Sequence, residues 1–272
     1  MYPYELFFGL DFYSILMTVG VIVCMVFIRL MADRRGLRAR FQNLLLFHTV
    51  AAVVLGYGAA VVTQGLYNIA ALGRFEINQS TGATFYGGLI GGTAVFIIGY
   101  FIVGHFCFRD GYHVRNFRTV SDIAPACITV AHGFGRLGCL MAGCCHGAPT
   151  EAWYGIPMFV NGTDQPPVRM VPVQLFEALF LFALSGFLLW WFLRGKRYEM
   201  PVYMLTYGVW RFIAEYLRND YRGQTFVDFW SPSQLVSVVL IVGGTVLLTI
   251  ELWLDRRPTA RRPAKRGREH RE

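Results

Sequence analysis

Charged residues are scarce in this chain: Asp, Glu, Lys and Arg make up 15% of its 272 residues, against about 25% in soluble domains. Acidic residues are the scarcer kind, with 17 Asp and Glu beside 25 Lys and Arg. The sequence also lacks linkers, internal repeats and low-complexity stretches before its basic tail. The shortage of charge excludes an ordinary soluble enzyme, and the absence of linkers excludes a string of separate domains.

Hydrophobic residues take the place of the missing charges, at 55% of the chain, with a mean hydropathy of +0.43. A helix of about 20 apolar residues crosses the hydrocarbon layer of a membrane. Seven runs approach this length: Asp11–Met31, Leu44–Tyr67, Thr84–Cys107, Val120–Cys144, Val173–Leu193, Met200–Leu217 and Ser233–Leu254. We therefore predict an all-α polytopic membrane protein. The first run is not expected to be a cleaved signal peptide, since no basic segment precedes it and no soluble body follows.

Basic residues are divided unevenly between the two ends of these runs. Eighteen Lys and Arg follow the first, third, fifth and seventh runs, whereas the opposite side holds only Arg74, Arg169, Arg218 and Arg222. The positive-inside rule predicts an external N-terminus and a cytoplasmic C-terminus. The net charge of +8 follows from this asymmetry, so no nucleic-acid partner is expected. We predict one transmembrane domain, residues 1–255, and a basic, disordered tail, residues 256–272.

The longest loop, residues 146–172, lies on the predicted outer side. Its prolines, glycines and aromatic residues indicate a structured external cap rather than a flexible tether. The loop contains the glycosylation sequon Asn161-Gly162-Thr163, which we interpret as a chance occurrence.

Two arginines lie inside the predicted membrane helices. Arg136 and Arg211 are each roughly 10–15 Å below the outer surface at ~1.5 Å per residue. An arginine at that depth costs several kcal/mol unless it faces a polar cavity or a partner. An ion pair with Glu215, one turn after Arg211, is the simplest alternative. Two arginines at matched depth on separate helices favour an anion site instead, in which guanidinium groups bind the phosphate of a phospholipid.

Other polar groups are expected at the same depth. Four residues of the sixth run recur at helical spacing, which predicts one polar face: Tyr207, Arg211, Glu215 and Arg218. The third run brings Tyr86 beside Gly87 and Gly88, which permit close approach of a helix or a ligand, and the first run begins near Tyr13. Glu177 in the fifth run is a weaker candidate, best explained by a hydrogen bond to the loop or to the sixth run.

The end of the fourth run is the most ambiguous feature, because Cys139, Cys144, Cys145 and His146 lie within eight residues. Free cysteines pack well in a glycine-rich helix, and an oxidising exterior would permit a disulfide. A zinc site is disfavoured by the irregular spacing and the absence of a second pair. In a fourth interpretation Cys144 is a nucleophile and His132 or His146 is its base. We predict no metal site.

The stretch GFGRLGCLMAGCCHG, residues 133–147, resembles the signature of bacterial prolipoprotein diacylglyceryl transferases, G-R-x-G-N-F-x-N-G-E-x-x-G. Further segments resemble the family in the same order along nearly the whole chain: FYGGLIG at 85–91, SDIAP at 121–125, VPVQLFEA at 171–178 and YGVWRFIAEYLR at 207–218. Tyr13 matches a tyrosine of the family's first helix.

The resemblance implies transfer of the diacylglyceryl group of phosphatidylglycerol to the lipobox cysteine of a prolipoprotein, with release of glycerol phosphate, at the bacterial cytoplasmic membrane. It implies that Arg136 and Arg211 hold the phosphate and stabilise its leaving charge. Glu215 would orient Arg211, while Tyr13 and Tyr207 would donate hydrogen bonds to the lipid headgroup. No metal, nucleotide or other cofactor is implied.

Departures from the family pattern fall in the half of the site that activates the acceptor. Tyr86 stands in place of a histidine often proposed to activate the acceptor thiol, and a tyrosine is a poor base at neutral pH. Cys139 and Ala142 replace asparagines, Cys144 replaces a glutamate, and Val171 replaces a histidine. The phosphate-binding half is kept. We therefore predict a shared donor lipid and an altered acceptor step.

The predicted site draws on most of the membrane runs. The catalytic candidates are Arg136, Arg211, Tyr86, Glu215, Cys144 and His146. The substrate-binding candidates are Tyr13, Gly87, Gly88, Cys139, Tyr207 and Arg218. The expected partners are phosphatidylglycerol or a related phospholipid and the signal peptides of preprolipoproteins. The alternatives are a divergent paralogue with another acceptor and a phospholipid-binding or transport protein without chemistry.

Overall fold

The computed structural model describes residues 4–7, 9–73, 77, 84–160, 165–219 and 230–256. Within these ranges the protein is built of eight α-helices, six of them long and apolar enough to cross a membrane. The six are α1 (Phe12–Arg34), α2 (Ala39–Leu72), α3 (Phe85–Cys107), α5 (Phe117–Ala142), α6 (Val173–Leu193) and α8 (Pro232–Arg256). The predicted all-α polytopic membrane fold is confirmed.

The sixth predicted span, Met200–Leu217, is shorter than the other six in the structure. Helix α7 (Glu199–Ala214) has 16 residues and continues as one 3-10 turn, η1 (Glu215–Leu217). Arg218 therefore lies beyond the helix, in an isolated antiparallel bridge with Gly147. The prediction that Arg218 shares a helical face with Tyr207 was wrong, because the α-helical repeat stops one turn earlier.

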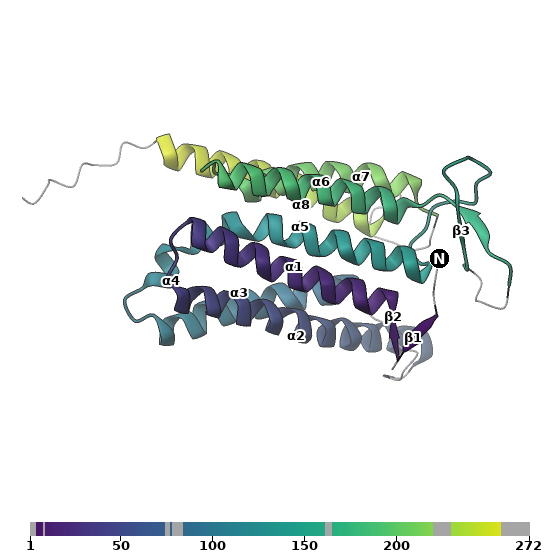
Figure 1. Ribbon diagram of the computed structural model, residues 1–272, viewed down its shortest axis with the longest axis horizontal. Helices are drawn as coiled ribbons and strands as arrows, with labels where there is room; N and C mark the ends of the chain where they lie inside the picture. Colours follow the sequence, from purple (N-terminus) through teal and green to yellow (C-terminus); the bar gives the residue numbers. More distant parts are fainter. Residues whose placement is uncertain are drawn as a thin grey trace, which may run out of the picture.

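The long helices run side by side in three layers (Figure 1). Helices α1 and α5 form the middle layer, the α2–α3 pair lies on one side, and α6, α7 and α8 lie on the other. Helix α5 is the centre of the fold, since just over half of its spanning segment is buried and the other spans are more exposed. Its Ala126 is fully enclosed in the main hydrophobic core, and Pro125 beside it is buried.

The two ends of the bundle differ in character (Figure 1). One end carries two small antiparallel hairpins, β1–β2 (Glu5–Phe7, Leu10–Asp11) and β3–β4 (Ile156–Met158, Val168–Met170). The other carries the short helix α4 (Tyr112–Arg115) and ion pairs such as Arg118–Asp255, at 3.0 Å. The β3–β4 hairpin gives the predicted cap a regular core, whereas the side of the membrane it faces stays a prediction.

Three sequence-based expectations fall outside the described residues. The sequon Asn161-Gly162-Thr163 and two of the four arginines counted on the outer side, Arg74 and Arg222, belong to ranges that are not described. The same is true of the basic tail after Arg256.

Glycines set the separation of α2 and α3. A Cβ added to Gly91 would overlap the Cβ of Ala59, whereas a Cβ added to Gly58 would meet no atom within 4 Å. Membrane helices that approach this closely gain packing contacts that larger residues would prevent. The contact explains Gly87 and Gly88 as well, because their added Cβ atoms would meet Thr63 and Ala60 of α2.

We expect Gly91→Ala to lower the free energy of unfolding by about 1–3 kcal/mol, the usual effect of overpacking. The matched control Gly58→Ala adds the same methyl group on the same helix pair and should not lower it, since alanine also favours the helix. The measurement is the unfolding midpoint of the detergent-solubilised protein. Equal midpoints for both variants would contradict the close contact.

Candidate active site

Arg136 and Glu177 form a buried ion pair between α5 and α6. The Arg136 Nε lies 2.9 Å from Glu177 Oε2, and their side chains are 10% and 0% exposed. Neither of these two atoms makes a well-aligned hydrogen bond, so charge rather than hydrogen-bond direction holds the pair. The Tyr207 hydroxyl of α7 donates to the other carboxylate oxygen at 3.0 Å. His132 approaches the same oxygen at 3.9 Å, so three helices converge on Glu177.

Arg211 is the centre of a second cluster, which joins α7, α8 and α3. Its Nη2 lies 2.6 Å from Glu215 Oε2 and donates to Ser233 Oγ at 2.9 Å. The Ser231 hydroxyl donates to the second oxygen of Glu215 at 2.8 Å. The Tyr86 hydroxyl donates to Ser233 Oγ at 3.2 Å. Tyr86 is thereby connected to the arginine through Ser233.

The two clusters belong to one site, because Arg136 and Arg211 both lie close enough to Glu177 for their charges to interact. The sequence indicated Glu215 as a partner of Arg211, which the structure confirms, but named no partner for Arg136, which the structure pairs with Glu177. Among the described residues, the buried Nη1 of Arg211 has no hydrogen-bond partner. A buried donor without a partner is costly, and a guanidinium N–H suits a phosphate oxygen.

Cys139 lies in the last turn of α5, and Cys144 and Cys145 lie in the sharp turn that follows it. Gly143 adopts a left-handed conformation (φ 72°) and ends the helix. Cys145 also has a left-handed backbone (φ 62°), although it carries a side chain. The backbone therefore folds back, and the three Sγ atoms lie within 4.8 Å of one another. The Cys144 N–H donates to Cys139 O at 3.1 Å, and Gln174 Nε2 donates to Cys144 O at 2.5 Å.

The remaining site candidates lie at the same end of the bundle. Tyr13, in the first turn of α1, is 38% exposed and packs against Gly138, where an added Cβ would lie 3.0 Å from its ring. His146 has its Nδ1 at 2.9 Å from Gly147 O, so this nitrogen is directed at the loop. The side chain of Arg218 lies next to the Cys145 thiol.

Three of the residues predicted to bind substrate contact other parts of the protein. Gly87 and Gly88 contact α2, and the Tyr207 hydroxyl is bonded to Glu177. Their assignment to substrate binding stays a prediction, because helix packing and the Glu177 hydrogen bond already account for them. The predicted hydrogen bond between Glu177 and the sixth run is confirmed.

Sequence reasoning did not identify Ser233 and Gln174, which the structure brings into the site. Both are almost fully buried, at 2% and 0% exposed. The signal available for Ser233 was a run of polar residues, Ser233, Gln234 and Ser237, at the start of an otherwise apolar span. Polar side chains in a membrane helix tend to face the bundle interior.

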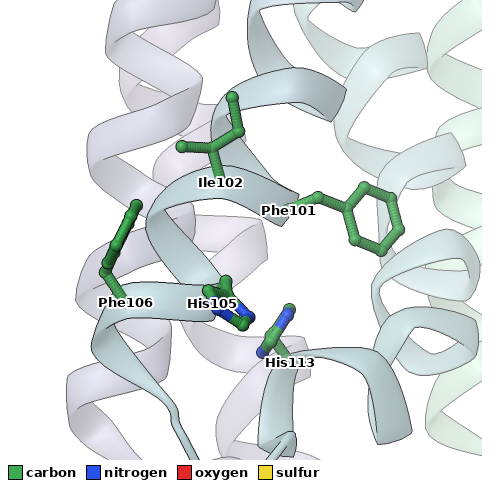
Figure 2. Close-up of a pocket in the computed structure, with 5 residues that line it drawn as sticks. All are labelled: Phe101, Ile102, His105, Phe106 and His113. Carbon is green, nitrogen blue, oxygen red and sulfur yellow. The ribbon is translucent and has the colours of Figure 1, made fainter.

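One surface pocket lies far from this site. It is lined by Phe101, Ile102, His105, Phe106 and His113, at the α3–α4 end of the bundle (Figure 2). None of the arginines or cysteines described above lines it. The anion-binding groups are instead buried between helices.

Comparisons with known proteins show similarity over nearly the whole chain. The family model for prolipoprotein diacylglyceryl transferase matches residues 4–250. A phosphatidylglycerol–prolipoprotein diacylglyceryl transferase 2 of Clostridium perfringens is 30% identical over 257 residues, which cover 93% of this chain and 96% of that protein. The phosphatidylglycerol–prolipoprotein diacylglyceryl transferase of Clostridium tetani is 28% identical and covers 90% and 95%. The match spans the helices that carry both arginine clusters, so the chain belongs to the prolipoprotein diacylglyceryl transferase family.

Proposed function

We propose that this protein transfers the diacylglyceryl group of phosphatidylglycerol to the thiol of a cysteine in a prolipoprotein, with release of glycerol phosphate. The observation that carries the proposal is the buried Nη1 of Arg211, which has no hydrogen-bond partner among the described residues, near a second buried guanidinium, Arg136. The names of the relatives supply the donor and the acceptor class. Six membrane-spanning helices would let the acyl chains remain in lipid while the headgroup reaches the arginines.

The two guanidinium groups would act on the leaving phosphate. The acceptor sulfur forms a bond to the glyceryl carbon while the bond from that carbon to the phosphate oxygen breaks, and the phosphate leaves with the electron pair. Donors fixed in a site with little water stabilise such developing charge strongly. Glu177 and Glu215 hold the guanidinium groups in place, so little reorganisation accompanies the reaction.

The acceptor step would not use Tyr86 as its base. Its hydroxyl already donates to Ser233, which in turn accepts a hydrogen bond from Arg211. Tyr86 therefore supports the phosphate-binding half of the site. Another group at this end of the bundle must favour the thiolate form of the acceptor.

The proposed location is the bacterial cytoplasmic membrane, with the hairpin-bearing end outside. The count of basic residues supports this orientation, and the structure groups the arginine-rich connections at the other end. Residues 1–255 would form the transferase domain, with the basic tail in the cytoplasm.

Transfer can be tested with the purified protein in phosphatidylglycerol liposomes and a lipobox peptide that contains one cysteine. We expect the peptide to gain the mass of a diacylglyceryl group and glycerol phosphate to appear in equal amount. Phosphatidylethanolamine liposomes and a serine peptide are the matched controls. Binding of phosphatidylglycerol with neither product would refute transfer and favour a lipid-binding protein.

A further inference from the structure

The thiol cluster, defined as Cys139, Cys144 and Cys145, is the strongest unassigned feature of the structure. The three Sγ atoms lie within 4.8 Å of one another, and the group of described residues that meets this spacing consists of these cysteines alone. Zinc bonds to sulfur at about 2.3 Å, which places the sulfurs of one tetrahedral ion about 3.8 Å apart. Small side-chain adjustments would bring all three sulfurs onto one ion.

The backbone around the cluster is arranged to bring the thiols together. Cys145 has a left-handed conformation (φ 62°), which side chains with a Cβ rarely adopt and which is concentrated at functional sites. Gln174, from α6, holds the turn through Cys144 O. Close packing of the cysteines would require neither the left-handed residue nor the hydrogen bond from Gln174. A disulfide would use two of the thiols and leave the third without a role.

The electrostatic surroundings suit a thiolate-bound divalent cation. Three thiolates on one Zn²⁺ ion carry one net negative charge, and Arg218 lies next to Cys145. Arg136 is also near enough to interact with Cys139 and Cys145.

Three ligands leave one position of a tetrahedral ion open, the arrangement typical of catalytic rather than structural zinc sites. His146, the next residue along the chain, has its Nδ1 directed at Gly147 O and is not part of the group. Cys144 is exposed, so the cluster can be reached from outside the fold.

We propose that Cys139, Cys144 and Cys145 bind one Zn²⁺ ion whose fourth position takes the thiol of the acceptor cysteine. The part of this proposal that concerns the acceptor thiol rests on the proposed function. Coordination deprotonates a thiol, and the proton passes to solvent. The zinc-bound thiolate then forms a bond to the glyceryl carbon as the phosphate leaves and is bound by the arginines. The ion thus activates the acceptor thiol, which Tyr86 cannot do.

Metal binding is tested without lipid or acceptor, so its result is independent of transfer activity. The full chain, purified in detergent with a non-chelating reductant, should contain about one zinc per molecule. Cys145→Ser and the triple serine variant should each lose it, whereas Cys107→Ser, outside the cluster, should retain it. An unchanged helical circular-dichroism spectrum would show that the variants are folded. Three titratable thiols without zinc, even after Zn²⁺ is added, would overturn the site, as would a disulfide in the purified protein.

The open position is tested with the Co²⁺-substituted protein, whose visible spectrum reports the ligands of the ion. A lipobox peptide with one cysteine should shift this spectrum, and the same peptide with serine should not. An unchanged spectrum would overturn the acceptor role, even if zinc is bound. A spectral shift without product would leave the ion site standing and count against the proposed transfer.

Discussion

Replacing Arg211 with alanine is expected to reduce transfer by at least about 100–1,000-fold, the usual effect of removing one preorganised donor from a developing charge. Arg211 pairs with Glu215 and donates to Ser233 of α8, which also accepts from Tyr86 of α3, and its buried Nη1 is the donor available to a phosphate. Arg136→Ala should have a comparable effect. Lysine at either position should fail as well, because an ammonium group lacks the planar fork.

These variants should be compared in the liposome assay at equal amounts of folded protein. Arg115→Ala is the matched control, since Arg115 is exposed and lies in α4 at the far end of the bundle. It should retain normal turnover. Near-normal turnover of Arg136→Ala or Arg211→Ala would contradict the assignment of that arginine to the phosphate.

Removing Glu177 is expected to have the largest effect on stability. Glu177 is fully buried, pairs with Arg136 and accepts a hydrogen bond from Tyr207. Glu177→Ala would leave the buried guanidinium without its counter-charge, which costs about 3–5 kcal/mol when one partner of such a pair is removed. The measurement is the unfolding midpoint in detergent.

A double variant separates stability from function at this pair. Glu177→Leu combined with Arg136→Met removes both charges and should recover most of the lost stability, because apolar residues of similar volume often replace a buried pair without penalty. Transfer should stay absent, since the phosphate has lost a ligand. A double variant as unstable as Glu177→Ala would show that the pair itself is not the cause.

Much of the fold could be predicted from composition and periodicity. Six of the seven apolar runs became long helices within a few residues of their expected bounds. The signal is strong because a membrane helix must satisfy its backbone internally and present apolar side chains over its full length. The exception was the sixth run, whose helix ends at Ala214. Polar residues around Glu215 weakened the apolar signal there.

The site was only partly predictable. The intramembrane arginines were identified from their depth alone, because a charged side chain in the hydrocarbon layer is costly unless it faces a polar cavity or a partner. Glu177 was underestimated and Ser233 was not considered. Their contacts depend on how α6 and α8 are rotated against α5 and α7, and helical periodicity on one element carries no information about the rotation of the next.

The sequence by itself determined that this is a multi-pass membrane protein with two buried arginines, because length, apolar composition and the cost of a buried charge are local properties. Only the tertiary structure decided which carboxylate meets each arginine and whether the cysteines converge. Cys139 lies on a helix, and Cys144 and Cys145 lie beyond its end. Their sulfurs meet because Gly143 and Cys145 both turn through the left-handed region, a backbone path that the spacing of three cysteines does not specify.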